Sequence, residues 1–174
     1  GQNTNGQLGL GNTVNQGTPV ALSASSFGGE KVAQISSGTS FTLFLTESGE
    51  VYATGSNVQQ QIGPNGSGRS VSAPVLVDIP GKVVSIEAGT NTAVVITESG
   101  AVYGWGQSDF GQLLKGAVQA DGTLASFDAD SSATPTLLPG LPGDLVEIHI
   151  GSRWGIGITA DGEVWVWGNQ GWLD

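Results

Sequence analysis

The sequence predicts an all-β protein, a β-propeller of four-stranded antiparallel blades, with three blades present. The first observation is a unit that recurs three times, ending in SGTSFTLFLTESGEVYATG (37–55), AGTNTAVVITESGAVYGWG (88–106) and IGSRWGIGITADGEVWVWG (150–168). The second is the even spacing, about 50 to 60 residues, of the glycines that lead the turns, Gly1, Gly55, Gly106 and Gly168. A repeat of roughly that length, made of short strands, is typical of propeller blades.

The composition supports this fold class. The chain holds 29 glycines and seven prolines among 174 residues, and 11% of its residues are charged. Glycine and proline suit many short strands joined by tight turns. Hydrophobic residues make up 38%, enough to bury a core. No run approaches the roughly 18 apolar residues of a membrane-spanning helix, so no membrane insertion is expected.

Each repeat contains four candidate strands. The first strands are expected at 18–22, 73–79 and 134–138, the second at 31–36, 83–88 and 145–150, the third at 41–46, 92–97 and 154–159, and the fourth at 50–54, 101–105 and 163–167. Apolar residues alternate along them, as in Val94 and Ile96. Ser-Gly or Asp-Gly separates the third strand from the fourth, which predicts tight hairpins. A proline opens each first strand, where a missing amide donor does no harm.

The organisation expected is one domain over 1–174, with repeats at 1–54, 55–105 and 106–167 and the start of a fourth at 168–174. An insertion at 114–132 lengthens the third repeat, and we expect it to be the largest and most mobile loop. Propellers typically close with roughly four to eight blades. We therefore expect these blades to be part of a longer ring, with association between copies of the chain as the alternative.

Several motifs resemble one known repeat. The chain opens with GQNTNGQLGLGN (1–12), continues with Thr18-Pro19, and closes two repeats with VYGWG (102–106) and VWVWG (164–168). This pattern is similar to the regulator of chromosome condensation repeat, and the resemblance implies a seven-bladed propeller. The family's inner histidine is replaced by Phe41, Thr92 and Trp154. Such divergence resembles bacterial extracellular members and implies a location outside the cell or on its surface.

Charge and chemistry exclude several function classes. The net charge is −10, with only five lysines and arginines, so no nucleic-acid partner is expected. The chain has no cysteine and a single histidine, His149, with no nucleophile motif or phosphate-binding loop to accompany it. We expect no enzyme activity and no cofactor. Asp128 and Asp130 resemble half of a calcium loop, but the central glycine and the bidentate glutamate are missing, so they are weak metal candidates.

The function that remains is a non-catalytic module that binds a protein, or a glycan, through the loops of its blades. The candidate contacts follow the repeated glycines or are tryptophans at a strand start or in a turn: Thr39, Ser40, Thr90, Asn91, Ser152, Arg153, Trp154 and Trp172. Tryptophan is enriched among residues that dominate binding energy. Two alternatives stay open. In the first, the blades complete a ring or fibre with other chains, including as a homo-oligomer. In the second, the resemblance extends to a guanine-nucleotide-exchange type of regulator.

Overall fold

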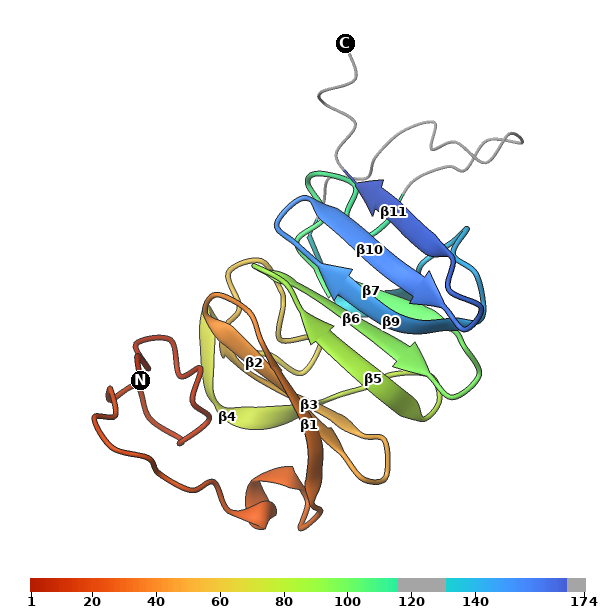
Figure 1. Cartoon of the computed structure of the whole chain (residues 1–174). Coiled ribbons are helices and arrows are strands. Elements are labelled where there is room, and N and C mark those ends of the chain that lie inside the picture. The colour runs from red at the N-terminus through yellow and green to blue at the C-terminus, as the bar shows by residue number, and fades with distance from the viewer. Residues whose placement is uncertain (116–130, 169–174) are drawn as a thin grey trace.

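A computed structural model describes residues 1–115 and 131–168 and shows an all-β propeller fragment (Figure 1). The elements are η1 (Ala24–Phe27), β1 (Val32–Ser37), β2 (Phe41–Thr46), β3 (Val51–Ser56), β4 (Ser70–Val77), β5 (Val83–Ala88), β6 (Thr92–Thr97), β7 (Val102–Gly106), β8 (Ser132–Leu137), β9 (Leu145–Ile150), β10 (Trp154–Thr159) and β11 (Val164–Gly168). They form two four-stranded sheets, β1-β2-β3-β4 and β5-β6-β7-β8, and one three-stranded sheet, β9-β10-β11. All neighbouring strands are antiparallel.

Most predicted strands are confirmed. The bounds of β2, β5, β6, β9 and β10 are those expected, and the other observed strands overlap the expected segments. The strand predicted at 18–22 was wrong, because this segment has no regular structure. In the described residues the only helix is the four-residue η1, and none is long and apolar enough to cross a membrane. Most of the predicted insertion, 116–130, lies outside the described residues.

The assignment of strands to blades also needs correction. The segments predicted to open the second and third repeats are the outer strands of the preceding sheets. β4 pairs with β3, with Tyr52 opposite Leu76, and β8 pairs with β7, with Tyr103 opposite Leu137. In the first two blades the segment that follows the third strand therefore pairs with that strand. Pro74 is tolerated because β4 is an edge strand.

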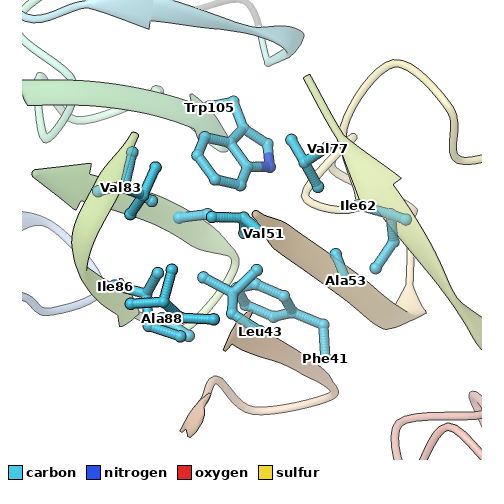
Figure 2. Packing of buried hydrophobic residues seen from close by; sticks show 13 residues of the cluster. Phe41, Leu43, Val51, Ala53, Ile62, Val77, Val83, Ile86, Ala88 and Trp105 are labelled. Carbon is cyan, nitrogen blue, oxygen red and sulfur yellow. The ribbon is translucent and has the colours of Figure 1, made fainter. Parts of the chain in front are cut away.

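The blades stack face to face, with their first strands β1, β5 and β9 side by side. The side chain of Gln34 in β1 makes two hydrogen bonds to the backbone of Ile86 in β5, at 3.2 and 3.3 Å. Between the first two blades lies a core that includes Phe41, Leu43 and Trp105, all fully buried (Figure 2). A second core, with Val94 and Ile148, joins the second and third blades. Burial of apolar area between blades is therefore what stabilises the array.

Glycines fix two kinds of turn. Gly49, Gly100 and Gly162 have φ of 95°, 83° and 93°, which confirms the predicted hairpins. Gly38 directly follows strand β1. A Cβ on Gly38 would lie 2.2 Å from the carbonyl oxygen of Gly89 in the next blade. Only glycine lets the two turns approach so closely.

Candidate functional site: the loop face

One end of the array gathers the loops that we call the loop face. It comprises the turns 38–40, 89–91 and 151–153, the loops 57–69 and 107–115, and the N-terminal loop 1–17. Antiparallel strands alternate in direction, so the first and third connections of every blade leave from the same end. The turns led by Gly1, Gly55 and Gly106 accordingly share this face, and the turn after Gly168 lies outside the described residues.

One polar residue stands at the same place in each of the three described glycine-led loops. Asn3 Oδ1 accepts a hydrogen bond from the Leu8 backbone at 2.9 Å, and Asn57 Oδ1 accepts one from Ile62 at 3.2 Å. Ser108 holds the equivalent place in the third loop. Its shorter side chain is fully buried, and its hydroxyl has no partner. The third loop is therefore the least well supported of the three.

The two non-glycine residues with positive φ in the described part of the chain stand where the repeat has glycine. Gln60, at φ 61°, stands at the repeat position that Gly6 holds in the first loop. Leu114, at φ 50°, stands at the position that Gly9 holds there. The fold thus keeps the left-handed turn after the glycine is lost. Gln60 also accepts a hydrogen bond from the Ala133 backbone at 2.8 Å, which links two loops.

Amide side chains tie the loop 57–69 to the second blade. Gln61 is fully buried, and its Nε2 donates to Asn91 Oδ1 at 3.3 Å, while Asn91 Nδ2 donates to Gln107 Oε1 at 3.1 Å. Asn91, a predicted partner contact, is therefore engaged within the fold. Gln112 is the equivalent of Gln61, but Arg153 stands where Asn91 would be. Gln112 Nε2 is buried without a hydrogen-bond partner.

The predicted threonine and serine contacts lie on the turns. The Thr39 backbone donates to the Thr90 carbonyl oxygen at 3.3 Å, so these residues adjoin across the first two blades. Thr39 and Ser152 are exposed, Thr90 is half-buried, and the Ser40 carbonyl oxygen accepts a hydrogen bond from Ser56. Their role as partner contacts stays a prediction.

Arg153 and Phe110 form the most distinctive contact of the face. The guanidinium carbon lies 4.1 Å from the centre of the Phe110 ring, a cation–π geometry. Arg153 is exposed and Phe110 is half-buried. The sequence analysis proposed Arg153 but missed Phe110, because the two residues are far apart in the chain. Phe110 could have been found as the aromatic residue of the glycine-led turn GQSDFG (106–111).

Trp154 lies beside this face. It opens β10 as Phe41 opens β2, and each ring covers the preceding turn glycine, Gly151 or Gly38. Phe41 is fully buried by the second blade, whereas Trp154 is 52% exposed on the open flank of the third blade. Trp154 thus has the position of an inter-blade core residue. Trp172, Asp128 and Asp130 lie outside the described residues.

The opposite face is acidic. It holds eight carboxylates, from Glu30, Glu47, Glu50, Asp78, Glu98, Asp144, Asp161 and Glu163. The Ser48 hydroxyl donates to Glu30, and the Thr159 hydroxyl donates to Asp161, and each hydrogen bond lowers the pKa of the carboxyl. Within residues 1–115 and 131–168, no three His, Asp or Glu side chains are placed to hold a metal. The two faces of the array therefore differ in charge.

Comparison with known proteins identifies the repeat. A family model for the regulator of chromosome condensation (RCC1) repeat matches residues 1–45 and 48–96, more than half of the chain, and a second RCC1 repeat model matches residues 32–61 and 83–112. The bovine secretion-regulating guanine nucleotide exchange factor is 37% identical over 175 residues, covering 98% of this chain and 36% of that protein. Human E3 ubiquitin-protein ligase HERC2 is 33% identical over 170 residues, 94% of this chain and 3% of that protein.

Solved structures agree on the fold. Human WBSCR16 superposes with a TM-score of 0.79 at 23% identity, over 97% of this chain and 42% of that one. Prp20p from Saccharomyces cerevisiae gives 0.67 at 21% identity, over 90% and 38%. This chain thus spans well under half of each relative. These relatives are eukaryotic, so the bacterial and extracellular origin stays a prediction. With its repeats, its stacked blades and its glycine-led loops, the chain belongs to the regulator of chromosome condensation (RCC1) repeat family.

Proposed function

We propose that this chain is a protein-binding propeller segment that carries out no chemistry itself and holds its partner on the loop face, around Arg153 and Phe110. The observation that carries the proposal is the stacked pair, at 4.1 Å. Stacking on the ring holds the guanidinium in place, so less side-chain freedom is lost when a partner binds. Arginine and aromatic residues are also those that dominate binding energies at protein interfaces.

The surroundings of the pair favour a protein ligand. The exposed hydroxyls of Thr39 and Ser152 supply neutral hydrogen-bonding groups on the same face. The described part of this face carries the cations Arg69, Lys115 and Arg153, against the single carboxylate Asp109. A partner surface that presents a carboxylate to Arg153 and an apolar side chain to Phe110 fits this arrangement. The acidic opposite face repels such a surface.

Affinity capture with matched variants tests the proposal. Arg153→Ala and Phe110→Ala should each lower the affinity for a captured protein partner about tenfold or more, since truncating a dominant contact costs upward of ~1.4 kcal/mol. Lys82→Ala is the control, because Lys82 is exposed on the acidic face. If Lys82→Ala weakens binding and the two loop-face variants do not, the partner binds elsewhere and the proposal fails.

A second candidate is regulation of nucleotide exchange. It is favoured by the 37% identity to the bovine exchange factor over 98% of this chain. The release of a fluorescent guanine nucleotide from purified small GTPases measures this activity directly. Acceleration by the chain, lost in Arg153→Ala, would make the loop face an exchange surface. Binding without acceleration would keep it a docking surface. The proposed location outside the cell rests on the divergence of the repeats alone.

A further inference from the structure

The side-chain amide of Gln112 is a buried hydrogen-bond donor without an acceptor. The residue is fully buried, and within residues 1–115 and 131–168 its Nε2 makes no hydrogen bond. Burial of an amide N–H without a partner costs free energy, so such groups are rare in folded proteins. Gln112 Nε2 is therefore open to an acceptor that the described part of the chain does not supply.

The equivalent residue Gln61 shows where this acceptor belongs. Gln61 Oε1 accepts a hydrogen bond from the Gln59 backbone at 2.8 Å, and Gln112 Oε1 accepts one from the Phe110 backbone at 2.9 Å. A tryptophan of the next blade donates to the backbone carbonyl oxygen of each glutamine, at 3.0 Å in both cases. The two side chains are thus held in the same way, and Gln61 Nε2 donates to Asn91 Oδ1 at 3.3 Å. The acceptor for Gln112 Nε2 therefore belongs at the place that Asn91 holds in the second blade.

Arg153 holds that place in the third blade and cannot serve as the acceptor. A guanidinium group has five N–H donors and no acceptor. Its contact with the Phe110 ring, at 4.1 Å, uses the face of the ring and leaves these donors available. Among the described residues, no carboxylate forms a salt bridge with Arg153. The third blade thus brings together two donors where the second blade has a donor and an acceptor.

We propose that an acidic side chain of the protein partner supplies this acceptor, with its carboxylate between Gln112 Nε2 and the Arg153 guanidinium. The inference rests on the proposed function, because it names the chemistry that the loop face recognises. An ionised carboxylate only accepts hydrogen bonds, and each of its two oxygens can take one of the two donors. Its single negative charge matches the one charge of Arg153, whereas a phosphate group carries about −1.5 to −2.

The buried amide lies within reach of a side chain from outside. Gln61 is fully buried, yet Asn91, which reaches it, is only half-buried, so the amide lies directly beneath the surface. Gln112 occupies the equivalent depth, and Arg153 beside it is exposed. A carboxylate bound there is partly removed from water, which strengthens its hydrogen bonds. The half-buried Phe110 ring lies next to the methylene groups of the same partner residue.

Acetate is the probe, because it reproduces the end of an aspartate side chain. Sodium acetate is titrated into the isotope-labelled chain at constant ionic strength, and the side-chain amide resonances are followed by NMR. The resonances of Gln112 are identified as the pair that disappears in Gln112→Glu. They should shift with acetate toward saturation, whereas those of Gln61, which already donates to Asn91, should stay in place. Acetamide, which is neutral and has the same shape, should bind at least about tenfold more weakly.

Two variants remove one donor each and keep the loop in place. Gln112→Glu retains the oxygen that accepts from the Phe110 backbone and loses Nε2. Arg153→Asn restores the residue that the second blade has at this position, so the chain supplies the acceptor itself. Each variant should weaken acetate binding about tenfold or more, since a charge-assisted hydrogen bond is lost. Arg153→Asn should also raise the urea midpoint of unfolding, which a loss of structure would not do.

The titration and affinity capture separate this inference from the proposed function. Gln112 resonances that do not shift with acetate would overturn the carboxylate site, and so would equal binding of acetamide or tighter binding of inorganic phosphate. If capture depends on Arg153 and Phe110 while acetate causes no shift, the docking surface stands and the carboxylate site fails. If acetate shifts the Gln112 resonances and capture does not depend on Arg153 or Phe110, the site is supported and the proposed docking fails.

Discussion

His149 Nδ1 of β9 lies 3.2 Å from Glu87 Oε1 of β5, so one side-chain contact joins the innermost strands of the second and third blades. The other ring nitrogen, Nε2, lies 2.8 Å from Glu147 Oε1. On the far side of Glu87, its second oxygen accepts a hydrogen bond from Ser36 of the first blade at 3.2 Å. Ser36, Glu87 and His149 are equivalent positions of the repeat, so this polar row crosses all three sheets.

The stability of the array should depend on pH through His149. Its hydrogen bonds, first to Glu147 and then to Glu87, raise the pKa of the imidazole above 6.5. A protonated ring donates from both nitrogens, whereas a neutral ring donates from one. Because the pKa is higher in the folded chain, this contribution is fully present below pH 6.5 and lost as the pH rises through the folded pKa. The side chain is 55% exposed, so the effect belongs to the ~0.2–1 kcal/mol range of surface pairs.

The measurement is simple because the chain has one histidine. Its ring resonance in a proton NMR titration should give a pKa above 6.5, and Glu147→Gln should lower this pKa more than Glu87→Gln does. The His149→Gln variant should lose the corresponding pH dependence of the unfolding free energy. A titration at or below the ordinary pKa would contradict the role of these contacts.

The close approach of Gly38 and Gly89 predicts a large cost for one methyl group. Gly38→Ala would place a Cβ 2.2 Å from the Gly89 carbonyl oxygen, and overpacking of this kind costs about 1–3 kcal/mol. Gly143→Ala is the matched control, because nothing lies within 4 Å of a Cβ there. Urea unfolding should show a clear loss for the first variant and almost none for the second. Equal losses would mean that the contact between Gly38 and Gly89 does not set the effect.

The sequence was sufficient for the strands but not for their grouping into blades. The short apolar runs bounded by turn residues predicted β2 and β6 to the residue, and both strands are buried along their whole length. Nothing local says whether the segment around Pro74 pairs with the strand before it or with the strand after it. Which strand this segment pairs with depends on the path of the loop 57–69 and on which neighbouring strand has an unpaired edge. The same ambiguity made Thr18–Leu22 look like a strand.

The loop face was predicted in outline for a similar reason. Equivalent turns of a repeat must share one end, so the exposed places of Thr39 and Ser152 could be anticipated. Asn91 could not, because its hydrogen bonds go to Gln61 and Gln107, which lie in other turns. The stacking of Arg153 on Phe110 likewise depends on two turns that meet only in the folded chain.

The loop-organising residues predict a contrast between two small substitutions. Asn57→Ala removes the acceptor of the Ile62 amide and should cost about 1–3 kcal/mol, since a buried donor is left without a partner. Ser108→Ala removes a buried hydroxyl that has no partner and should be close to neutral. Urea unfolding of the two variants measures this. A large loss in Ser108→Ala would show that its hydroxyl does bind something in solution.

Two tryptophans make the same contact at different depths, which allows burial to be tested separately from hydrogen bonding. Trp105 Nε1 donates to the Gln61 carbonyl oxygen, and Trp167 Nε1 donates to the Gln112 carbonyl oxygen, both at 3.0 Å. Each bond ties a blade to the loop of the blade before it. Trp105 is fully buried within the first inter-blade core, whereas Trp167 is only half-buried.

Replacement of each tryptophan by phenylalanine removes the donor and leaves a smaller ring. Trp105→Phe should lower the free energy of unfolding by about 2–4 kcal/mol, because a buried carbonyl oxygen loses its partner and a cavity opens. In Trp167→Phe, water can reach the site, so the loss should be about 1 kcal/mol. The unfolding of both variants in urea should be followed by far-ultraviolet circular dichroism, because a signal from tryptophan would be changed by the substitution itself. Equal losses would show that the hydrogen bond, and not the depth of the ring, determines how firmly the blades are joined.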